Sequence, residues 1–249
     1  MPGVPTDVAQ QVKTMREMCA PFADEYRNNL HFKKATLEHF GPGYGYIEAQ
    51  ALHGVIRSLK PKRIVEIGSG VSTYCMLQAL ALNATGYELT CVEPHPSDWL
   101  RSAKVNLIAQ PVQSVSPEVF KSLGAGDFLF IDSSHAVKTG GDVNYLILEV
   151  LPVLRPGVTV HFHDITLPYD YNPDTLQTFI QPQETALLHA FLIGNRGFEI
   201  LFCMSQIHHD RPEALKELFA DYRPQAMPNG LWIDNTRGHW PSSLYLRVV

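Results

Sequence analysis

Five side chains with acid–base or metal-binding chemistry stand at the ends of two apolar segments: Asp132, His135, His161, His163 and Asp164. The first two follow residues 128–131, and the other three close the segment that begins at residue 158. Histidine exchanges protons near neutral pH, and imidazole together with carboxylate binds divalent metals. In open α/β sheets ligands bind outside the carboxyl ends of the strands, so we expect both polar clusters at one site.

Alternation along the second strand separates its two histidines from the acid. His161 and His163 are two residues apart and share one face, whereas Asp164 turns outward at the strand tip. Because His161 lies deeper in the strand, we interpret it as a hydrogen-bonded core residue rather than a ligand.

A glycine-containing turn lies further upstream, where residues 63–67 predict a buried strand and Gly68-Ser69-Gly70 opens a helix. No Lys-Ser/Thr pair follows the glycines, which argues against a phosphate-binding P-loop. Position 73 is Thr, where a dinucleotide site has its third glycine. Glu66 before the glycines and Ser72 after them fit a ligand with an ammonium group and a ribose but no pyrophosphate. S-adenosylmethionine is such a ligand; the alternative is a glycine turn without a ligand.

A second acid agrees with this interpretation. Residues 87–92 predict another strand, and Glu93 ends it about 23 residues beyond Gly70, close to the spacing at which a carboxylate receives ribose hydroxyls.

The elements that must position these residues alternate between strand and helix. Further strands are predicted at residues 106–109, 127–131 and 158–163, and helices at 48–59, 117–123 and 141–151. One or two more helices are predicted within residues 5–37, before a glycine- and proline-rich hinge at 41–46. This alternation predicts an α/β fold, a mostly parallel sheet with helices on both faces.

Composition sets outer bounds on the function. With 249 residues, 45% of them hydrophobic, the chain fits one large α/β domain with appendages. A net charge of -5 and a pI near 6.1 indicate neither a nucleic-acid nor a membrane partner. Lacking a basic and apolar leader or a long apolar run, the protein is expected in the cytoplasm. Cys19, Cys75, Cys91 and Cys203 show no Cys-x-x-Cys spacing and are interpreted as reduced structural thiols.

Three segments together resemble a known class of enzymes: residues 64–73, 130–135 and 160–165. They are similar to the class I S-adenosylmethionine-dependent methyltransferases, and most similar to the bacterial small-molecule branch with the macrolide-sugar O-methyltransferases and cephalosporin hydroxylase-like proteins. The resemblance covers roughly residues 45–205 and implies a Rossmann-like, seven-stranded sheet that ends in an antiparallel C-terminal strand. Residues 198–202 and 244–248 are the candidates for its closing strand pair.

The resemblance also implies a domain organisation. Residues 1–45 would form an N-terminal helical cap, and residues 46–249 a methyltransferase domain with a substrate-covering insert at about 165–182. The cap and the insert would cover the cofactor and shape the acceptor pocket.

Carried over by position, the resemblance assigns cofactor contacts to Glu66, Gly68, Ser69, Gly70, Ser72, Glu93, Gln113 and Asp132. The first four would hold the methionine end, Glu93 the ribose, and Gln113 the adenine. If Asp132 has no catalytic role, it would only position the cofactor's amino group or a loop amide.

The implied activity is O-methylation of a sugar or natural-product hydroxyl, with His135, His163 and Asp132 as the catalytic residues. Some relatives hold a divalent metal at these strand ends, and the matching positions are Asp132, His163 and Asp164. Because His163 replaces an acid or amide of that pattern, iron, manganese or zinc suits the site better than magnesium. Without a metal, His135 or His163 would be the general base.

Two other functions stay open at this point: a metal-binding oxygenase-like relative, and a module that binds S-adenosylmethionine without catalysis. The expected partner is a small-molecule acceptor, and both a monomer and a homodimer are compatible with the sequence.

Overall fold

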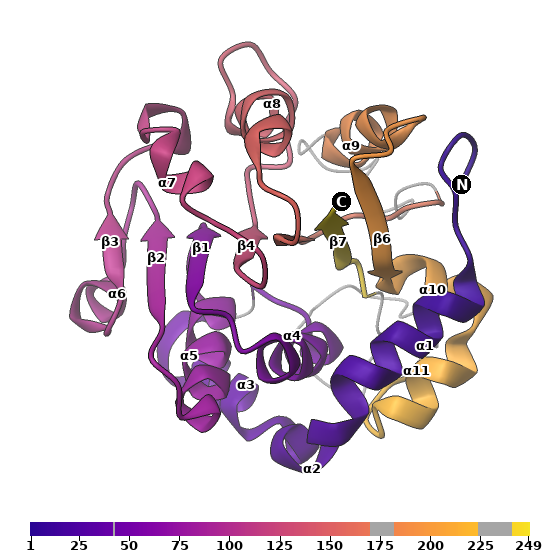
Figure 1. Ribbon diagram of the computed structural model, residues 1–249. Helices are drawn as coiled ribbons and strands as arrows, with labels where there is room; N and C mark the ends of the chain where they lie inside the picture. Colours follow the sequence, from indigo (N-terminus) through magenta and orange to yellow (C-terminus); the bar gives the residue numbers. More distant parts are fainter. Residues whose placement is uncertain (42, 170–181, 224–240) are drawn as a thin grey trace.

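The computed structural model describes residues 1–41, 43–169, 182–223 and 241–249 (Figure 1). Within these ranges seven strands form one sheet: β1 Arg63–Ile67, β2 Glu88–Val92, β3 Asn106–Ile108, β4 Phe128–Ile131, β5 Thr159–Phe162, β6 Phe198–Cys203 and β7 Leu244–Val248. Their order is β3-β2-β1-β4-β5-β7-β6, and β7 runs antiparallel to both of its neighbours while the other pairs are parallel. The predicted fold, including the antiparallel C-terminal strand, is confirmed.

Helices cover both faces of the sheet. Their bounds are α1 Val8–Cys19, α2 Ala23–Tyr26, α3 Leu30–Ala35, α4 Tyr46–Leu59, α5 Val71–Asn83, α6 Asp98–Ser102, α7 Glu118–Lys121, α8 Asp142–Tyr145, α9 Glu184–Leu192, α10 Met204–Asp210 and α11 Pro212–Leu218. In Figure 1, α7, α8 and α9 lie on one face, and α1, α3, α4, α5, α10 and α11 lie on the other. No helix in the described part of the chain is both long and apolar enough to cross a membrane.

Two apolar cores explain why the central strands are continuous apolar runs. In β4, Phe128 and Phe130 face the helices α4 and α5, whereas Leu129 and Ile131 face α8 and α9. All four side chains are fully buried. Successive strand residues point to opposite faces, so a strand covered on both sides has no position for a polar side chain until it ends.

The same topology gathers the polar residues at one edge. The carboxyl ends of the parallel strands β1, β2, β4 and β5 meet there. The chain runs from β1 to β2 and β3 on one side, and then crosses back to β4 on the other side of β1. Such a reversal of strand order is where open α/β sheets bind ligands.

The predicted cap and insert are placed only in part. Helix α1 packs against α4, β6 and α10. Residues 170–181 of the predicted insert lie outside the described residues. Covering of a cofactor by either segment therefore stays a prediction. All four cysteines are free and buried.

Candidate active site at the strand ends

The glycine turn runs against the end of β4. Gly68 has φ +91° and Gly70 φ +153°, in the region that side chains disfavour. A Cβ atom at position 68 would lie 2.7 Å from the carbonyl oxygen of Asp132. The amide of Gly68 donates to the carbonyl oxygen of Val92 at 3.0 Å. The amide of Asp132 donates to the carbonyl oxygen of Ile67, also at 3.0 Å. The turn is thus fixed to β2 and β4 at once, as its predicted place in the site requires.

Glu66 lies beneath this turn. Its fully buried carboxylate accepts hydrogen bonds from Ser72 Oγ and Thr73 Oγ1, both at 2.7 Å, and from Cys91 Sγ at 3.3 Å. Burial raises the pKa of Glu66 to about 7. Thr73 Oγ1 also accepts from the amide of Gly70 at 2.9 Å, so the carboxylate supports the turn through Thr73.

This placement differs from the direct ligand contacts expected of Glu66 and Ser72. Both side chains are buried and bond to each other, so in the described geometry they hold the first turn of α5 in place. The sequence indicated correctly that Glu66 needs polar partners, and two of those partners, Ser72 and Thr73, lie in the helix that follows its strand.

Glu93, the predicted ribose contact, lies at the end of β2 next to the glycine turn. It follows β2, is half-buried, and accepts from Ser69 Oγ at 3.2 Å and from the amide of His95 at 2.8 Å. Ser69 therefore joins the glycine turn to the second acid. Gln113 lies after β3, is exposed, and donates to the carbonyl of Gly140 at 3.0 Å.

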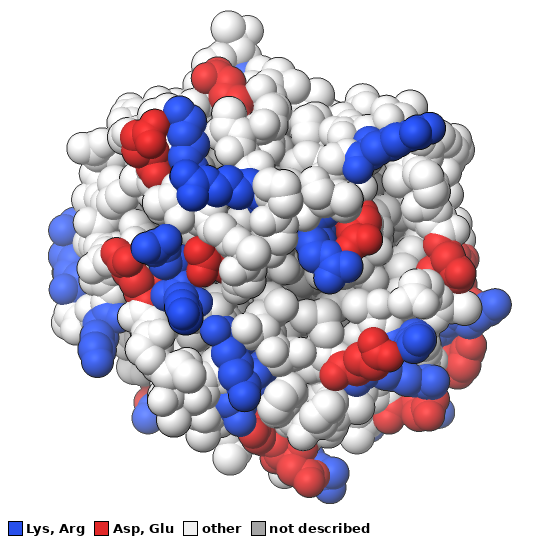
Figure 2. Space-filling view, viewed as in Figure 1, with Lys and Arg blue, Asp and Glu red and all other residues white. Residues whose placement is uncertain are grey.

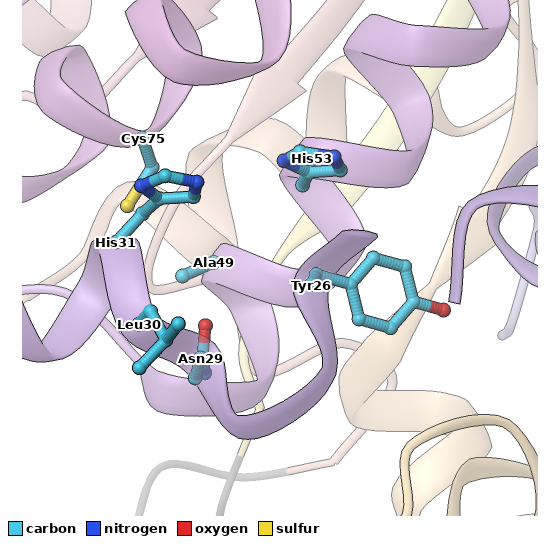
Figure 3. Close-up of a pocket in the computed structure, with 7 residues that line it drawn as sticks. All are labelled: Tyr26, Asn29, Leu30, His31, Ala49, His53 and Cys75. Atoms are coloured by element: carbon cyan, nitrogen blue, oxygen red, sulfur yellow. The ribbon is translucent and has the colours of Figure 1, made fainter. Parts of the chain in front are cut away.

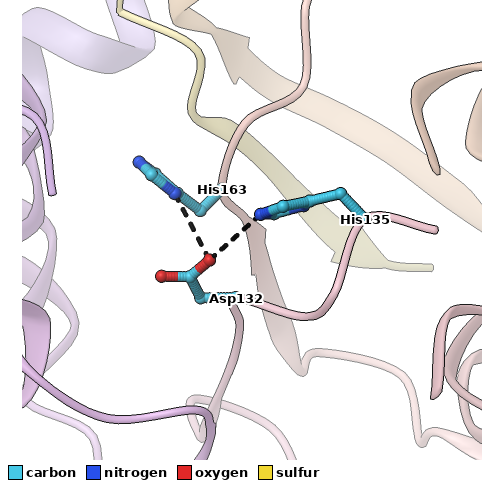
Figure 4. Close-up of side chains that lie close together, drawn as sticks. All are labelled: Asp132, His135 and His163. Atoms are coloured by element: carbon cyan, nitrogen blue, oxygen red, sulfur yellow. Dashed lines mark ion pairs between the residues drawn. The ribbon is translucent and has the colours of Figure 1, made fainter. Parts of the chain in front are cut away.

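Asp132 lies between two histidines (Figure 4). Its Oδ1 is 3.4 Å from His135 Nε2 and 3.4 Å from His163 Nδ1. One donor atom from each of the three residues can be chosen so that all lie within 4.8 Å of one another. The structure therefore brings together the three residues predicted to be catalytic.

Asp164 occupies a different place from the other predicted metal ligands. Its side chain is 49% exposed, and its oxygens lie 3.6 Å from His135 Nε2 and 3.7 Å from His163 Nε2. Asp164 Oδ1 accepts a hydrogen bond from Ser242 Oγ at 2.9 Å. The compact group of donor atoms contains His135 where the sequence predicted Asp164.

Two buried glutamates, which no sequence pattern selected, also belong to the site. Glu184 Oε2 is 2.7 Å from His135 Nδ1, and its Oε1 accepts from Ser133 Oγ at 2.9 Å. Glu48 Oε2 is 3.5 Å from His163 Nε2. Its Oε1 accepts from the amide of Ser242 at 3.0 Å and from Ser243 Oγ at 2.7 Å. Each acid lies in the first turn of a helix, where acidic residues are common for purely local reasons.

The charges of the site favour protonated imidazoles. Burial alone would lower the pKa of His135, but its bonds to Asp132 and Glu184 outweigh burial and raise that pKa to about 10. For His163, burial is likewise outweighed by Asp164, Asp132 and Glu48, which raise its pKa well above the ordinary value. The two imidazoles in turn keep the pKa of Asp132 below its ordinary value, against the effect of burial.

His161 is a core residue, as predicted. It is fully buried, its ring stacks on Phe130 with centroids 4.2 Å apart, and its Nε2 lies 3.0 Å from Ser243 Oγ. Burial lowers its pKa well below the ordinary value, so this imidazole is neutral.

A separate pocket lies among α3, α4 and α5 and the residues before α3 (Figure 3). It is lined by Tyr26, Asn29, Leu30, His31, Ala49, His53 and Cys75. It contains no residue predicted for the site. On the face of the molecule in Figure 2, Lys and Arg side chains alternate with Asp and Glu among the described residues.

The central segment of the chain matches a known protein family. Residues 65–165 match the model of a family described as a methyltransferase domain. The matched segment runs from within β1 to just past β5. It contains every residue predicted for the cofactor, for catalysis and for a metal.

A curated relative and several solved structures are also similar. The relative is an uncharacterized protein of Archaeoglobus fulgidus, 36% identical over 107 residues. The alignment covers 39% of this chain and 42% of that protein, so the chain spans less than half of its relative's length.

Two of the similar structures are methyltransferases with a bound cofactor or product. The SAH-bound methyltransferase PaMTH1 of Podospora anserina is 15% identical, with a TM-score of 0.46, and the match covers 95% of this chain and 88% of that one. The O-methyltransferase TomG of Streptomyces achromogenes, in complex with SAM, is 13% identical, with a TM-score of 0.46 and coverage of 98% and 91%.

Proposed function

We propose that the protein is an S-adenosylmethionine-dependent methyltransferase that methylates a hydroxyl oxygen of a small molecule, a sugar or another natural product. The observation that carries the proposal is the contact between the glycine turn and Asp132 inside a methyltransferase domain. This contact sets the predicted donor site beside the acid–histidine cluster. Methyl transfer is an in-line displacement, and holding donor and acceptor adjacent is its first requirement.

Binding of the donor is assigned to the edge formed by β1, β2 and β3. Glu93 offers two carboxylate oxygens for the ribose hydroxyls, and Gly68, Ser69 and Gly70 offer a turn without bulky side chains for the methionine end. Gln113 is the proposed adenine contact. The donor supplies the methyl group, while these residues bind and orient it.

Removal of the acceptor's proton is assigned to the acid–histidine cluster. A divalent metal there would lower the pKa of a bound hydroxyl. The metal-free alternative uses a histidine as general base, which requires the imidazole to be neutral. The raised pKa values of His135 and His163 count against that alternative at neutral pH.

One observation favours a second candidate function. Two histidines and one carboxylate that leave coordination positions open are the ligand set of non-haem iron oxygenases. An oxygenase-like relative would consume oxygen at this cluster and would not transfer a methyl group.

Calorimetry with S-adenosylmethionine tests the donor site. We expect binding by the wild-type protein, a loss of at least tenfold in affinity in Glu93→Ala, and no change in Glu88→Ala, which alters an exposed acid at the other end of the same strand. Absence of binding by the wild type would refute the methyltransferase proposal. Transfer of labelled methyl groups to a panel of hydroxylated small molecules, run with an oxygen electrode, then separates the two candidate functions.

A further inference from the structure

We propose that Asp132, His135 and His163 bind one divalent transition-metal ion, and that Glu184 and Glu48 orient the two histidines. The ligand atoms are Asp132 Oδ1, His135 Nε2 and His163 Nδ1. This inference rests on the site of the proposed function and specifies its metal chemistry.

The spacing of the three residues is that of metal ligands. Ligand atoms about 2.0–2.1 Å from a tetrahedral metal lie about 3.4 Å from one another. Asp132 Oδ1 is 3.4 Å from each of the two histidine nitrogens. Both distances are those of ion pairs, longer than the roughly 2.7–2.9 Å of a charged N–H···O hydrogen bond, and they match the separation of two ligands of one metal.

The state of His163 supports the site independently. Its side chain is only 7% exposed, and within the described part of the chain neither ring nitrogen has a hydrogen-bond partner. Its Nδ1 is directed at Asp132 (Figure 4). Buried polar groups are nearly always satisfied, and a metal at Nδ1 would satisfy this one.

A buried carboxylate lies behind each histidine. His135 Nδ1, opposite its ligand nitrogen, is 2.7 Å from Glu184, whose side chain is 1% exposed. His163 Nε2, also opposite its ligand nitrogen, is 3.5 Å from Glu48, whose side chain is 5% exposed. Metal-binding histidines typically donate their second N–H to a carboxylate, which fixes the tautomer and the ring orientation.

These two acids come from outside the matched methyltransferase segment. Glu48 lies on α4 and Glu184 on α9, whereas residues 65–165 form the domain match. The amide of Glu184 also donates to the carbonyl of His135 at 3.2 Å, so α9 is fixed to the loop that carries a ligand. The metal site is therefore a property of this chain's flanking helices as well as of its domain.

The donor set selects a class of metal. Two imidazoles and one carboxylate favour iron(II), cobalt(II) or zinc(II) over magnesium or calcium, which prefer all-oxygen sites. Asp164 lies outside this donor set, and its side chain is the most exposed of the acids near it, at 49%.

Cobalt(II) is the probe for the test, because its visible absorption reports nitrogen and oxygen coordination. We expect metal-free, untagged full-length protein to bind one equivalent, and zinc but not magnesium to displace it. Asp132→Asn and His135→Ala should lose at least a hundredfold in affinity. His209→Ala is the control, since it removes an exposed histidine from an unrelated helix.

The positioning role has its own readout. Glu184→Gln should fold with all three ligands present, weaken cobalt binding about 10–100-fold and shift its absorption bands. Glu184→Asp should recover part of the affinity. If the Gln variant fails to fold, the Asp variant and the comparison of His135→Ala with His209→Ala still test the site.

Two results would overturn the inference: no cobalt binding by the wild type, or equal affinity in the wild type and His135→Ala. Calorimetry with S-adenosylmethionine on the same samples keeps the two proposals apart. Cofactor binding without cobalt binding refutes the metal site alone. Cobalt binding without cofactor binding refutes the proposed function and leaves the metal site standing.

Discussion

Gly68 and Asp132 approach each other so closely that a Cβ on Gly68 would lie 2.7 Å from the carbonyl oxygen of Asp132. One residue belongs to the turn after β1 and the other follows β4, two strands that are paired in the sheet. The proposed donor site and the acid–histidine cluster therefore share a backbone contact. A displacement of the glycine turn is therefore expected to move Asp132 as well.

A side chain at position 68 tests this coupling. Gly68→Ala introduces the close contact and places a Cβ at φ +91°, and strained backbone of this kind costs about 1–3 kcal/mol. We expect a drop of that size in the free energy of unfolding, measured with urea, and weaker binding of S-adenosylmethionine. Gly86→Ala is the matched control, since a Cβ there meets no atom within 4 Å. Equal stability of the two variants would contradict the contact.

Glu66 gives the protein a pH-dependent stability. Its pKa is raised from 4.5 to about 7 by burial, so the folded state holds the proton more tightly than the unfolded state does. The resulting stabilisation is fully present below pH 4.5 and is lost as the pH rises through 7. A shift of this size corresponds to roughly 3 kcal/mol.

Urea unfolding of wild type and Glu66→Gln across pH 4–8 measures that contribution. We expect the wild type to lose stability relative to Glu66→Gln between about pH 4.5 and 7, with a constant difference above that range, because glutamine cannot ionise. Glu149→Gln, at an exposed position, should track the wild type. Parallel curves for wild type and Glu66→Gln would show that Glu66 does not titrate in this window.

The strands of this fold were predictable because each carries its own signal. Phe128 to Ile131 is apolar at every position, which a strand buried on both faces requires, and the polar residues begin where the strand ends. The residues at those ends, Asp132 and His163, were therefore also predictable as neighbours. Their order in the sheet places them together before any side-chain detail matters.

Glu48 and Glu184 were not predictable for a physical reason. An acid in the first turn of a helix is favoured by the helix dipole, so its presence needs no further explanation. What distinguishes these two is burial against His163 and His135, and that depends on how α4 and α9 dock. The placing of Glu66 shows the same limit, since its partners Ser72 and Thr73 lie in the first turn of α5, the helix after its strand.

The two aspartates of the cluster are expected to behave differently. Asp132 Oδ1 is 3.4 Å from both His135 Nε2 and His163 Nδ1. The Asp164 oxygens are 3.6 Å from His135 Nε2 and 3.7 Å from the other ring nitrogen of His163, Nε2, and the Asp164 side chain is 49% exposed. Asp164 has φ +55°, a conformation that Asn also tolerates. Asp164→Asn should therefore change methyl-transfer turnover less than tenfold, and Asp132→Asn should reduce it at least a hundredfold. Similar losses in both variants would restore Asp164 as a metal ligand.

Ser243 connects the core histidine to the buried acid behind His163. Its O–H must donate to Glu48 Oε1 at 2.7 Å, because a carboxylate has no proton to give. Ser243 Oγ then accepts a hydrogen bond from His161 Nε2–H at 3.0 Å. Among the described residues, His161 Nδ1 has no hydrogen-bond partner. The Ser243 hydroxyl thus fixes the tautomer of His161 and donates one of the hydrogen bonds that Glu48 Oε1 accepts.

Ser243→Ala removes both bonds inside the core. A buried polar group left without its partner costs about 1–3 kcal/mol, and we expect a loss of that size in the free energy of unfolding. Ser242→Ala is the neighbouring control. It removes a hydroxyl that donates to the half-exposed Asp164, and it leaves the Ser242 amide, which donates to Glu48, unchanged. That variant should lose less than about 0.5 kcal/mol. Because Glu48 faces His163, Ser243→Ala should also weaken cobalt binding, whereas a stability loss with unchanged cobalt affinity would mean that Glu48 does not orient His163.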